Sequence, residues 1–320
     1  MIKEKVTICF AHPAYQMAAQ FEKRETAYDC FQVWTPEELQ ARVHDFDVMV
    51  CSGFWNDGLL TQAPRLKFVQ SISAGINQYG VKNFEAAGIR LASAAGVNAN
   101  AVSEHAMAHI LSFTRLMHTG RDCQNQKLYR GMISDISQRE DELGGKTILI
   151  VGLGRIGKRL ARLAKAFDMR VIGTKQNSDM TLENVDEIYR SDQLKSHLPK
   201  ADFVVLTCPL NAETENLIDT EALALMKPSS YLINMARGPV VDEVALIIAL
   251  QNNAIAGAGL DVFAEEPLPL ESPLWEMRNV IVTPHAAGET RKYEDSVIDI
   301  LLENLSRLEQ GENELFNQVV

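Results

Sequence analysis

Three glycines spaced as Gly-x-Gly-x-x-Gly stand where the chain could bind a phosphate. Gly152, Gly154 and Gly157 begin at the end of the apolar run 146–152 and lead into an amphipathic run. The first glycine permits a tight turn, the second lets a pyrophosphate approach the backbone, and the third lets helix pack on strand. The helix N-terminus would bind phosphates through its N–H groups and dipole, with Arg155 as a further contact. The motif in this context predicts a dinucleotide site, whereas glycines in isolation would indicate only a turn.

The end of the next predicted strand, 168–173, bears on the choice of dinucleotide. An acidic residue about 20 positions after the first glycine commonly binds the ribose hydroxyls of NAD. Here the sequence reads Gly-Thr-Lys-Gln-Asn at 173–177, with Lys175 in place of the acid. Lys175 can attract a 2′-phosphate, and Thr174 and Gln176 can donate hydrogen bonds to it. We predict that NADP is preferred and NAD possible; the alternative is a solvated Lys175 with both cofactors accepted.

A cation, a carboxylate and an imidazole each end or follow a predicted strand in the second half of the chain. They are Arg237, Glu266 and His285, and open α/β sheets place ligands at such strand ends. The planar fork of arginine suits a carboxylate, and a histidine paired with a carboxylate can stay protonated and donate to an oxygen. Together with a hydride donor, these groups meet the needs of 2-oxo acid reduction. Each residue alone could instead be solvated or structural.

Six segments resemble the D-2-hydroxyacid dehydrogenase family, and they follow the family's order over nearly the whole chain. They are SISAGINQ at 71–78, GVNANAVSEHAMA at 96–108, GLGRIG at 152–157, INMARGPVVDE at 233–243, GAGLDVFAEEP at 257–267 and TPHAAGET at 283–290. The resemblance, to glyoxylate and hydroxypyruvate reductases among others, implies hydride transfer between NAD(P)H and C2 of a small 2-oxo or 2-hydroxy acid. It implies that Arg237 binds the substrate carboxylate and that His285 is the general acid/base paired with Glu266. Glu265 is the competing partner, but the family places the functional acid directly before proline.

The resemblance also implies contacts for further residues. Ala74 and Gly75 would offer backbone donors to the substrate carboxylate, unless they form a plain turn. Phe54 and Trp55 would form an apolar wall beside the substrate, or could equally belong to the core. Other residues expected at the cofactor are Ile156, Cys208, Pro209, Met235, Ala236, Asp261, His285 and Gly288, with Asn98 and Val102 nearby. Among them, Asp261 would contact the nicotinamide carboxamide, and Cys208 with Pro209 the adenine pocket.

Alternating β-rich and helical runs predict two α/β domains. Expected strands lie at 5–10, 47–52, 66–72, 88–93, 146–152, 168–173, 202–208, 230–235, 256–262 and 279–284, with helical patterns at 101–120 and 289–308. We predict two doubly wound parallel-sheet domains, with a Rossmann cofactor domain inserted into a flavodoxin-like substrate domain. The substrate domain is expected to comprise 1–100 and 287–320, and the dinucleotide-binding domain 101–286.

Composition limits the possible partners. The chain has 320 residues and is 46% hydrophobic, more apolar material than one compact domain commonly holds. Its formal net charge of -11 would repel nucleic acid and anionic membrane surfaces. We therefore expect a small-molecule substrate and neither a nucleic acid nor a membrane as partner, and the resemblance implies a homodimer.

The cysteines and histidines indicate a cytoplasmic protein without a metal. The five cysteines include no Cys-x-x-Cys pair, and a reducing compartment fits them best. No apolar run is long enough to cross a bilayer. His105 and His109 are four apart on the expected helix and could form one face of a metal site, but no third ligand pattern accompanies them, so we expect none.

Three alternatives share the expected fold, and phosphoglycerate dehydrogenase is the less expected one because many of its forms carry a further regulatory domain. A dinucleotide-sensing corepressor could retain much of the site, but the low basicity and the lack of an extra interaction segment argue against it. Formate dehydrogenases have glutamine where this chain has Glu266.

Overall fold

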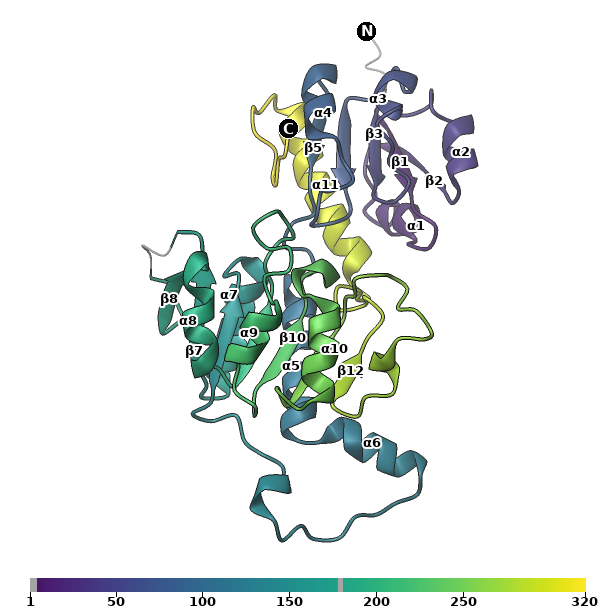
Figure 1. Ribbon diagram of the computed structural model, residues 1–320. Coiled ribbons are helices and arrows are strands. Elements are labelled where there is room, and N and C mark those ends of the chain that lie inside the picture. Colours follow the sequence, from purple (N-terminus) through teal and green to yellow (C-terminus); the bar gives the residue numbers. More distant parts are fainter. Residues whose placement is uncertain (1–4, 178–180) are drawn as a thin grey trace. The chain divides into compact units, whose positions relative to one another are not determined.

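The computed structural model describes residues 5–177 and 181–320. The chain divides into two compact units (Figure 1). The first unit combines the part of the chain up to Asn98 with Thr290–Val320, and the second comprises Ala99–Glu289. The second unit is therefore inserted into the chain of the first.

The first unit is built on a five-stranded parallel sheet with the order β2-β1-β3-β4-β5. Its elements are β1 (Thr7–Ala11), α1 (Met17–Glu22), β2 (Asp29–Val33), α2 (Pro36–Ala41), β3 (Val48–Cys51), α3 (Leu59–Gln62), β4 (Phe68–Ser71), α4 (Val81–Ala87), β5 (Arg90–Ala92) and α11 (Tyr293–Glu309). This is the doubly wound order of flavodoxin-like folds. The central strands β3 and β4 are buried along their whole length, as strands covered on both faces must be.

The second unit contains a seven-stranded parallel sheet with the order β12-β11-β10-β9-β6-β7-β8. Its elements are α5 (Ala99–Thr114), α6 (Met117–Asn125), β6 (Thr147–Val151), α7 (Arg155–Ala166), β7 (Arg170–Lys175), β8 (Glu187–Arg190), α8 (Leu194–His197), β9 (Phe203–Leu206), α9 (Thr220–Leu225), β10 (Tyr231–Asn234), α10 (Glu243–Gln251), β11 (Gly257–Leu260) and β12 (Val280–Val282). If the strands of this sheet are numbered 1 to 7 along the chain, their spatial order from the β8 side is 3-2-1-4-5-6-7. The order 3-2-1-4-5-6 is the Rossmann arrangement, and here a seventh strand is added. The predicted fold class is confirmed.

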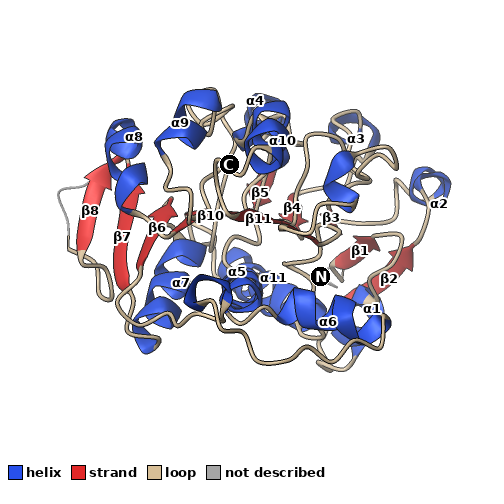
Figure 2. Cartoon of the chain, turned by 60° about the horizontal axis from the view of Figure 1, so that its bottom comes forward, coloured by secondary structure: helices blue, strands red, loops and turns tan. Residues whose placement is uncertain are grey.

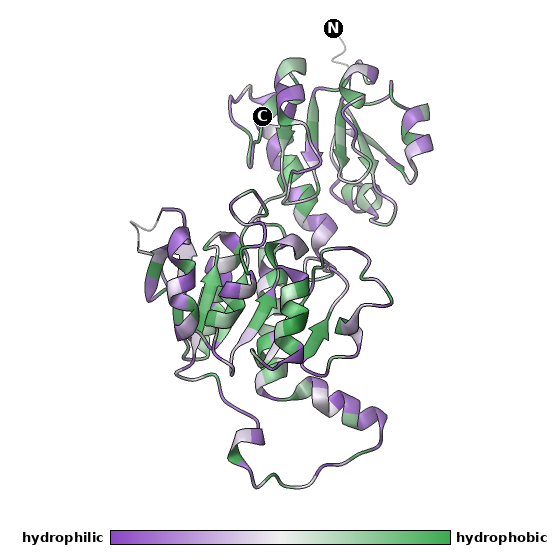
Figure 3. Ribbon diagram, viewed as in Figure 1, coloured by the Kyte–Doolittle hydropathy of each residue, from purple (hydrophilic) through white to green (hydrophobic). Residues whose placement is uncertain are grey.

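Helices cover both faces of each sheet (Figure 2). In the second unit, α9 and α10 pack on one face with Leu223 and Leu246, whereas α5 and α7 pack on the other with Ile110 and Leu160. In the first unit, α2, α3 and α4 share one core and α1 and α11 the other. Figure 3 shows hydrophobic residues in the strands of each unit and along α10. In each sheet the parallel strands have their carboxyl ends on the same side, and most of the residues predicted for the site follow these strand ends.

The structure differs from the sequence prediction in three elements. β2 and β8 were not predicted, because these strands lie at sheet edges and are mostly half-buried, so they lack a continuous apolar run. The single helix expected at 101–120 is two helices. Leu116 takes a left-handed conformation with φ of 51°, which interrupts the helix between α5 and α6.

Within the described parts of the chain, no helix is both long enough and apolar enough to cross a membrane.

Candidate active site

The three glycines form a cradle between β6 and α7. Gly152 has φ of 101°, and a Cβ there would come within 2.8 Å of the Cys208 backbone. A Cβ on Gly157 would come within 2.3 Å of the Gly152 carbonyl oxygen, so this glycine lets the helix pack on the loop. At Gly154 a Cβ would meet open space, and no described side chain caps the helix there. The cradle leaves room for a pyrophosphate at the helix N-terminus and fits a dinucleotide.

The end of β7 supports this loop. Thr174 is buried, and its carbonyl oxygen accepts hydrogen bonds from the Gly152 and Leu153 N–H groups at 3.2 and 3.1 Å. Its burial does not fit the predicted side-chain contact with a phosphate. Gln176 is exposed and donates to Glu213 Oε2 at 2.7 Å.

Lys175 is half-buried at the last position of β7 and lies in register with Arg190, the last residue of β8. Arg190 forms an ion pair with Asp192 on the surface, with 3.3 Å between Arg190 Nη2 and Asp192 Oδ2. Two cations therefore end neighbouring strands. Arg190 was not singled out from the sequence because β8 was not recognised as a strand.

Arg237 follows β10 in a turn that Asn234 holds. The buried Asn234 side chain accepts from the Ala236 N–H at 3.0 Å and donates to the Arg237 carbonyl oxygen at 3.1 Å. Gly238 lies so close to Phe263 that a Cβ would come within 1.8 Å of the Phe263 carbonyl oxygen. The Arg237 side chain is exposed, with its Nη1 donating to the Ala236 carbonyl oxygen at 2.7 Å. A guanidinium held by one backbone contact keeps donors for a carboxylate.

Glu266 and His285 meet beside this turn. His285 Nδ1 lies 2.7 Å from Glu266 Oε2, and Glu266 Oε1 accepts from the Phe263 N–H at 3.0 Å. Glu266, and not Glu265, is thus the residue paired with the histidine. An ionised carboxylate only accepts hydrogen bonds, so Nδ1 is the donor and Nε2 is left for another group. About half of the His285 side chain is exposed, which leaves it accessible to a ligand.

Asp261 fixes the segment that carries His285. It is buried at the end of β11, and its Oδ1 accepts from the Ala286 N–H and its Oδ2 from the Ala287 N–H, both at 3.0 Å. Thr283 Oγ1 also donates to Asp261 Oδ1 at 2.6 Å. The carboxylate is therefore held by residues on both sides of His285.

Other residues expected at the cofactor lie near the carboxyl ends of the strands in the same sheet. Cys208 is buried, which raises the pKa of its thiol to about 11, so it is a neutral, weakly polar group. Met235 and Ala236 are buried at the end of β10, and Ile156 is half-buried in the first turn of α7. Pro209 is exposed and Gly288 half-buried.

The expected substrate-binding residues belong to the first unit. Ala74 and Gly75 lie in the half-buried loop after β4, where the Ser71 hydroxyl accepts from the Ser73 N–H at 3.0 Å. Phe54 is half-buried in the loop after β3. Trp55 is 8% exposed and stacks on Phe84 with ring centroids 4.8 Å apart. This burial fits the core alternative for Trp55 and leaves Phe54 as the more accessible ring.

The two histidines of α5 have different surroundings. His109 is buried, and the space left by Gly259 receives its ring, since a Cβ there would come within 2.3 Å of His109 Nδ1. Burial, together with the neighbouring His105, lowers the pKa of His109 to about 4, so it is a neutral core residue at physiological pH. Among the described residues no cluster of three His, Cys, Asp or Glu side chains could hold a metal. His105 Nε2 instead lies 3.0 Å from Thr283 Oγ1.

Comparison with known proteins identifies the family. Residues 107–287 match the model of "D-isomer specific 2-hydroxyacid dehydrogenase, NAD binding domain". A glyoxylate reductase of Pyrococcus furiosus is 35% identical over 291 residues, covering 86% of this chain and 83% of its own. Glyoxylate/hydroxypyruvate reductase B of Yersinia enterocolitica is 36% identical over 271 residues, covering 84% and 82%. The crystal structure of a D-isomer specific 2-hydroxyacid dehydrogenase from Xanthobacter autotrophicus Py2, in complex with NADPH and MES, has a TM-score of 0.81 at 26% identity, covering 99% of this chain and 98% of its own.

The fold, the glycine cradle and these similarities define a nicotinamide dinucleotide-dependent oxidoreductase. The chain belongs to the D-isomer specific 2-hydroxyacid dehydrogenase family.

Proposed function

We propose that the chain is a D-2-hydroxyacid dehydrogenase that acts as a reductase of a small 2-oxo acid. The observation that carries the proposal is the 2.7 Å contact between His285 Nδ1 and Glu266 Oε2, close in the chain to the buried Asp261. The similarity to glyoxylate reductases supports a small substrate. It also disfavours the alternative of a dinucleotide-sensing corepressor.

The proposed chemistry divides among three side chains. When bound, the nicotinamide supplies a hydride to C2 of the 2-oxo acid. His285 Nε2 donates its proton to the carbonyl oxygen as negative charge develops there, and the new hydroxyl keeps that proton. Glu266 stabilises the imidazolium before transfer and holds the ring in one orientation. Arg237 binds the substrate carboxylate through its planar fork.

We propose further substrate contacts from residues that follow β3 and β4. The backbone N–H groups of Ala74 and Gly75 would donate to the carboxylate, and Phe54 would contact the apolar part of the substrate. We propose that Gly152, Gly154, Gly157 and the residues around them bind the cofactor.

Replacing His285 with alanine tests the proton donor. We expect kcat for glyoxylate reduction to fall by about 10²-fold or more, because a positioned general acid contributes about 10² to 10⁴. The cofactor dissociation constant, measured by fluorescence titration, should change little because the glycine cradle is intact. A kcat within twofold of wild type would show that another group donates the proton.

We further propose that NADPH is preferred over NADH. No carboxylate ends β7, whereas Lys175 and Arg190 end neighbouring strands in register. Two cations there favour a 2′-phosphate, which carries almost two negative charges near neutral pH. The Xanthobacter autotrophicus relative was crystallised with NADPH.

The ratio of kcat/KM for NADPH over NADH measures this preference. We expect a ratio above one in wild type and a drop of about tenfold in Lys175→Asp, which corresponds to ~1.4 kcal/mol. Lys82→Asp makes the same charge change on α4 and should leave the ratio unchanged. A wild-type ratio below one contradicts the proposal, and a ratio unaffected by Lys175→Asp would assign the preference to other residues.

We also propose a homodimer that uses the segment from α6 to residue 136. Within the described parts of the chain, no residue of α6 is buried. The segment after α6 has four exposed apolar residues, Leu128, Tyr129, Met132 and Ile136. In Figure 1 this segment projects away from the sheet of its unit. Such clustered apolar exposure is typical of an interface.

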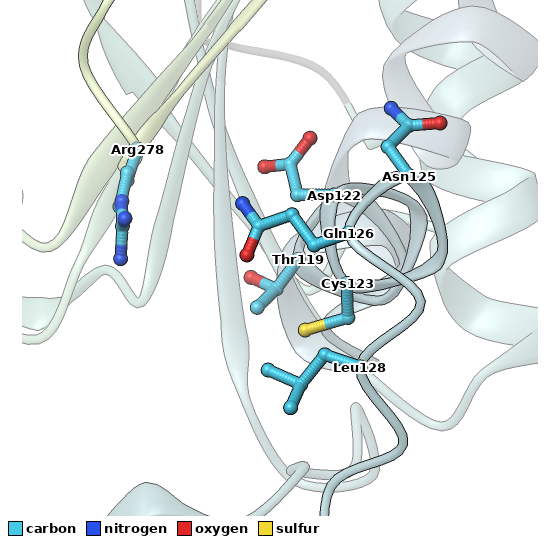
Figure 4. A pocket seen from close by; sticks show the side chains of 7 residues that line it. All are labelled: Thr119, Asp122, Cys123, Asn125, Gln126, Leu128 and Arg278. Carbon is cyan, nitrogen blue, oxygen red and sulfur yellow. The ribbon is translucent and has the colours of Figure 1, made fainter.

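A cavity of about 230 Å³ lies between α6 and Arg278 (Figure 4), and none of the predicted site residues lines it.

Sedimentation of the protein tests the dimer. We expect twice the mass of one chain for wild type and the mass of one chain for the double variant Tyr129→Glu, Met132→Glu. Val244→Glu places a single glutamate at another exposed apolar position, on α10, and should remain dimeric. A monomeric wild type, or a double variant that stays dimeric, would contradict the proposal.

The cytoplasm is the proposed location. All five cysteines are free, as a reducing compartment would keep them.

A further inference from the structure

A chain of hydrogen bonds leads from α5 to the segment that carries His285. It begins at His105 Nε2, which lies 3.0 Å from Thr283 Oγ1, and continues from Thr283 Oγ1 to Asp261 Oδ1 at 2.6 Å. Asp261 is 2% exposed and accepts the backbone N–H groups of Ala286 and Ala287. All five residues belong to the second unit.

The donor and acceptor in each hydrogen bond follow from the number of protons that each side chain can donate. Thr283 has one hydroxyl proton, and Asp261 Oδ1 at 2.6 Å is a much closer acceptor than the Leu260 carbonyl oxygen at 3.5 Å. With its proton committed to Asp261, the hydroxyl can only accept from His105. His105 therefore carries a hydrogen on Nε2 and is a donor in this chain.

His285 needs such support because of its backbone conformation. Its φ is 54°, in the left-handed region that costs a non-glycine residue about 1 kcal/mol or more. Its N–H donates to the Thr283 carbonyl oxygen at 3.1 Å, and the next two N–H groups are the ones that Asp261 holds. The orientation of the Asp261 carboxylate thus sets where the His285 ring meets Glu266.

We propose that His105 is a positioning residue for His285, acting through Thr283 and Asp261. It orients the Thr283 hydroxyl, which orients the Asp261 carboxylate, which in turn holds the backbone after His285. This inference rests on the proposed role of His285 as proton donor. It assigns to His105 a contribution to kcat without contact with the substrate.

Variants of His105 and Thr283 test whether the His105 Nε2–H donor affects catalysis. His105→Leu and Thr283→Val should each lower kcat for glyoxylate reduction by about 10-fold or more, since small misplacements of a reacting group are costly. His105→Gln puts an amide donor near the position of the imidazole Nε2 and should keep kcat within about threefold of wild type. The loss of kcat in the double variant His105→Leu, Thr283→Val should be no greater than the larger of the two single losses, because both residues act through one chain of hydrogen bonds.

Thr114→Val is the control. It removes a buried hydroxyl from the same helix, where this hydroxyl donates to the Ile110 carbonyl oxygen, and it should leave kcat unchanged.

A second measurement does not depend on turnover. In protein labelled with [15N]histidine, the His285 ring signals are assigned by their loss in His285→Ala. We expect these signals to shift in His105→Leu and Thr283→Val, to return towards wild type in His105→Gln, and to be unchanged in Thr114→Val.

The outcomes separate the two proposals. A wild-type protein that reduces no 2-oxo acid would overturn the proposed function, and the His285 signals would still decide whether His105 positions that ring. An active wild type whose kcat and His285 signals are unaffected by His105→Leu and Thr283→Val would overturn the positioning role alone. A His105→Gln variant as impaired as His105→Leu would also overturn it, because the donor would not be what matters.

Discussion

The hydrogen bond between His285 Nδ1 and Glu266 Oε2 is the interaction that the surrounding residues of the site hold in place. It joins two segments that are 19 positions apart, one after β11 and one after β12. Neither partner is deeply buried, so the pair is not required for a packed core. Its geometry is instead produced by the surrounding backbone, which fixes Glu266 through the Phe263 N–H and the segment after His285 through Asp261.

The parallel sheet explains why these segments meet. β10, β11 and β12 are neighbours in register, and the chain leaves all three at the same edge. Arg237, Asp261 and His285 follow these strands in turn, and the glycine cradle follows β6 at that same edge. Close packing is needed for this arrangement: Gly238 touches the Phe263 backbone, and Gly157 touches Gly152. The binding residues thus lie on short turns from rigid strands.

Much of the fold could be predicted because buried parallel strands and helix-starting glycines leave strong local signals. β6, β9 and β10 are buried strands made mostly of apolar residues, whereas the edge strands β2 and β8 are half-exposed and were missed. In the site, the motif residues Arg237, Glu266 and His285 were named from the sequence, and their catalytic roles stay predictions. The support from Asn234, Thr283 and His105 could not be predicted, because it depends on contacts between distant segments. Likewise, nothing in the residue type of Thr174 revealed that its side chain is buried while its carbonyl oxygen supports the cradle.

The pH dependence of glyoxylate reduction in Glu266→Gln, compared with wild type and with Glu265→Gln, tests the central claim most directly. Reduction needs a protonated His285, and the Glu266 carboxylate stabilises that form. The account predicts that kcat/KM falls at a lower pH in Glu266→Gln than in wild type, whereas Glu265→Gln keeps the wild-type profile. A Glu266→Gln profile that coincides with wild type, or a shift found only in Glu265→Gln, would contradict the account.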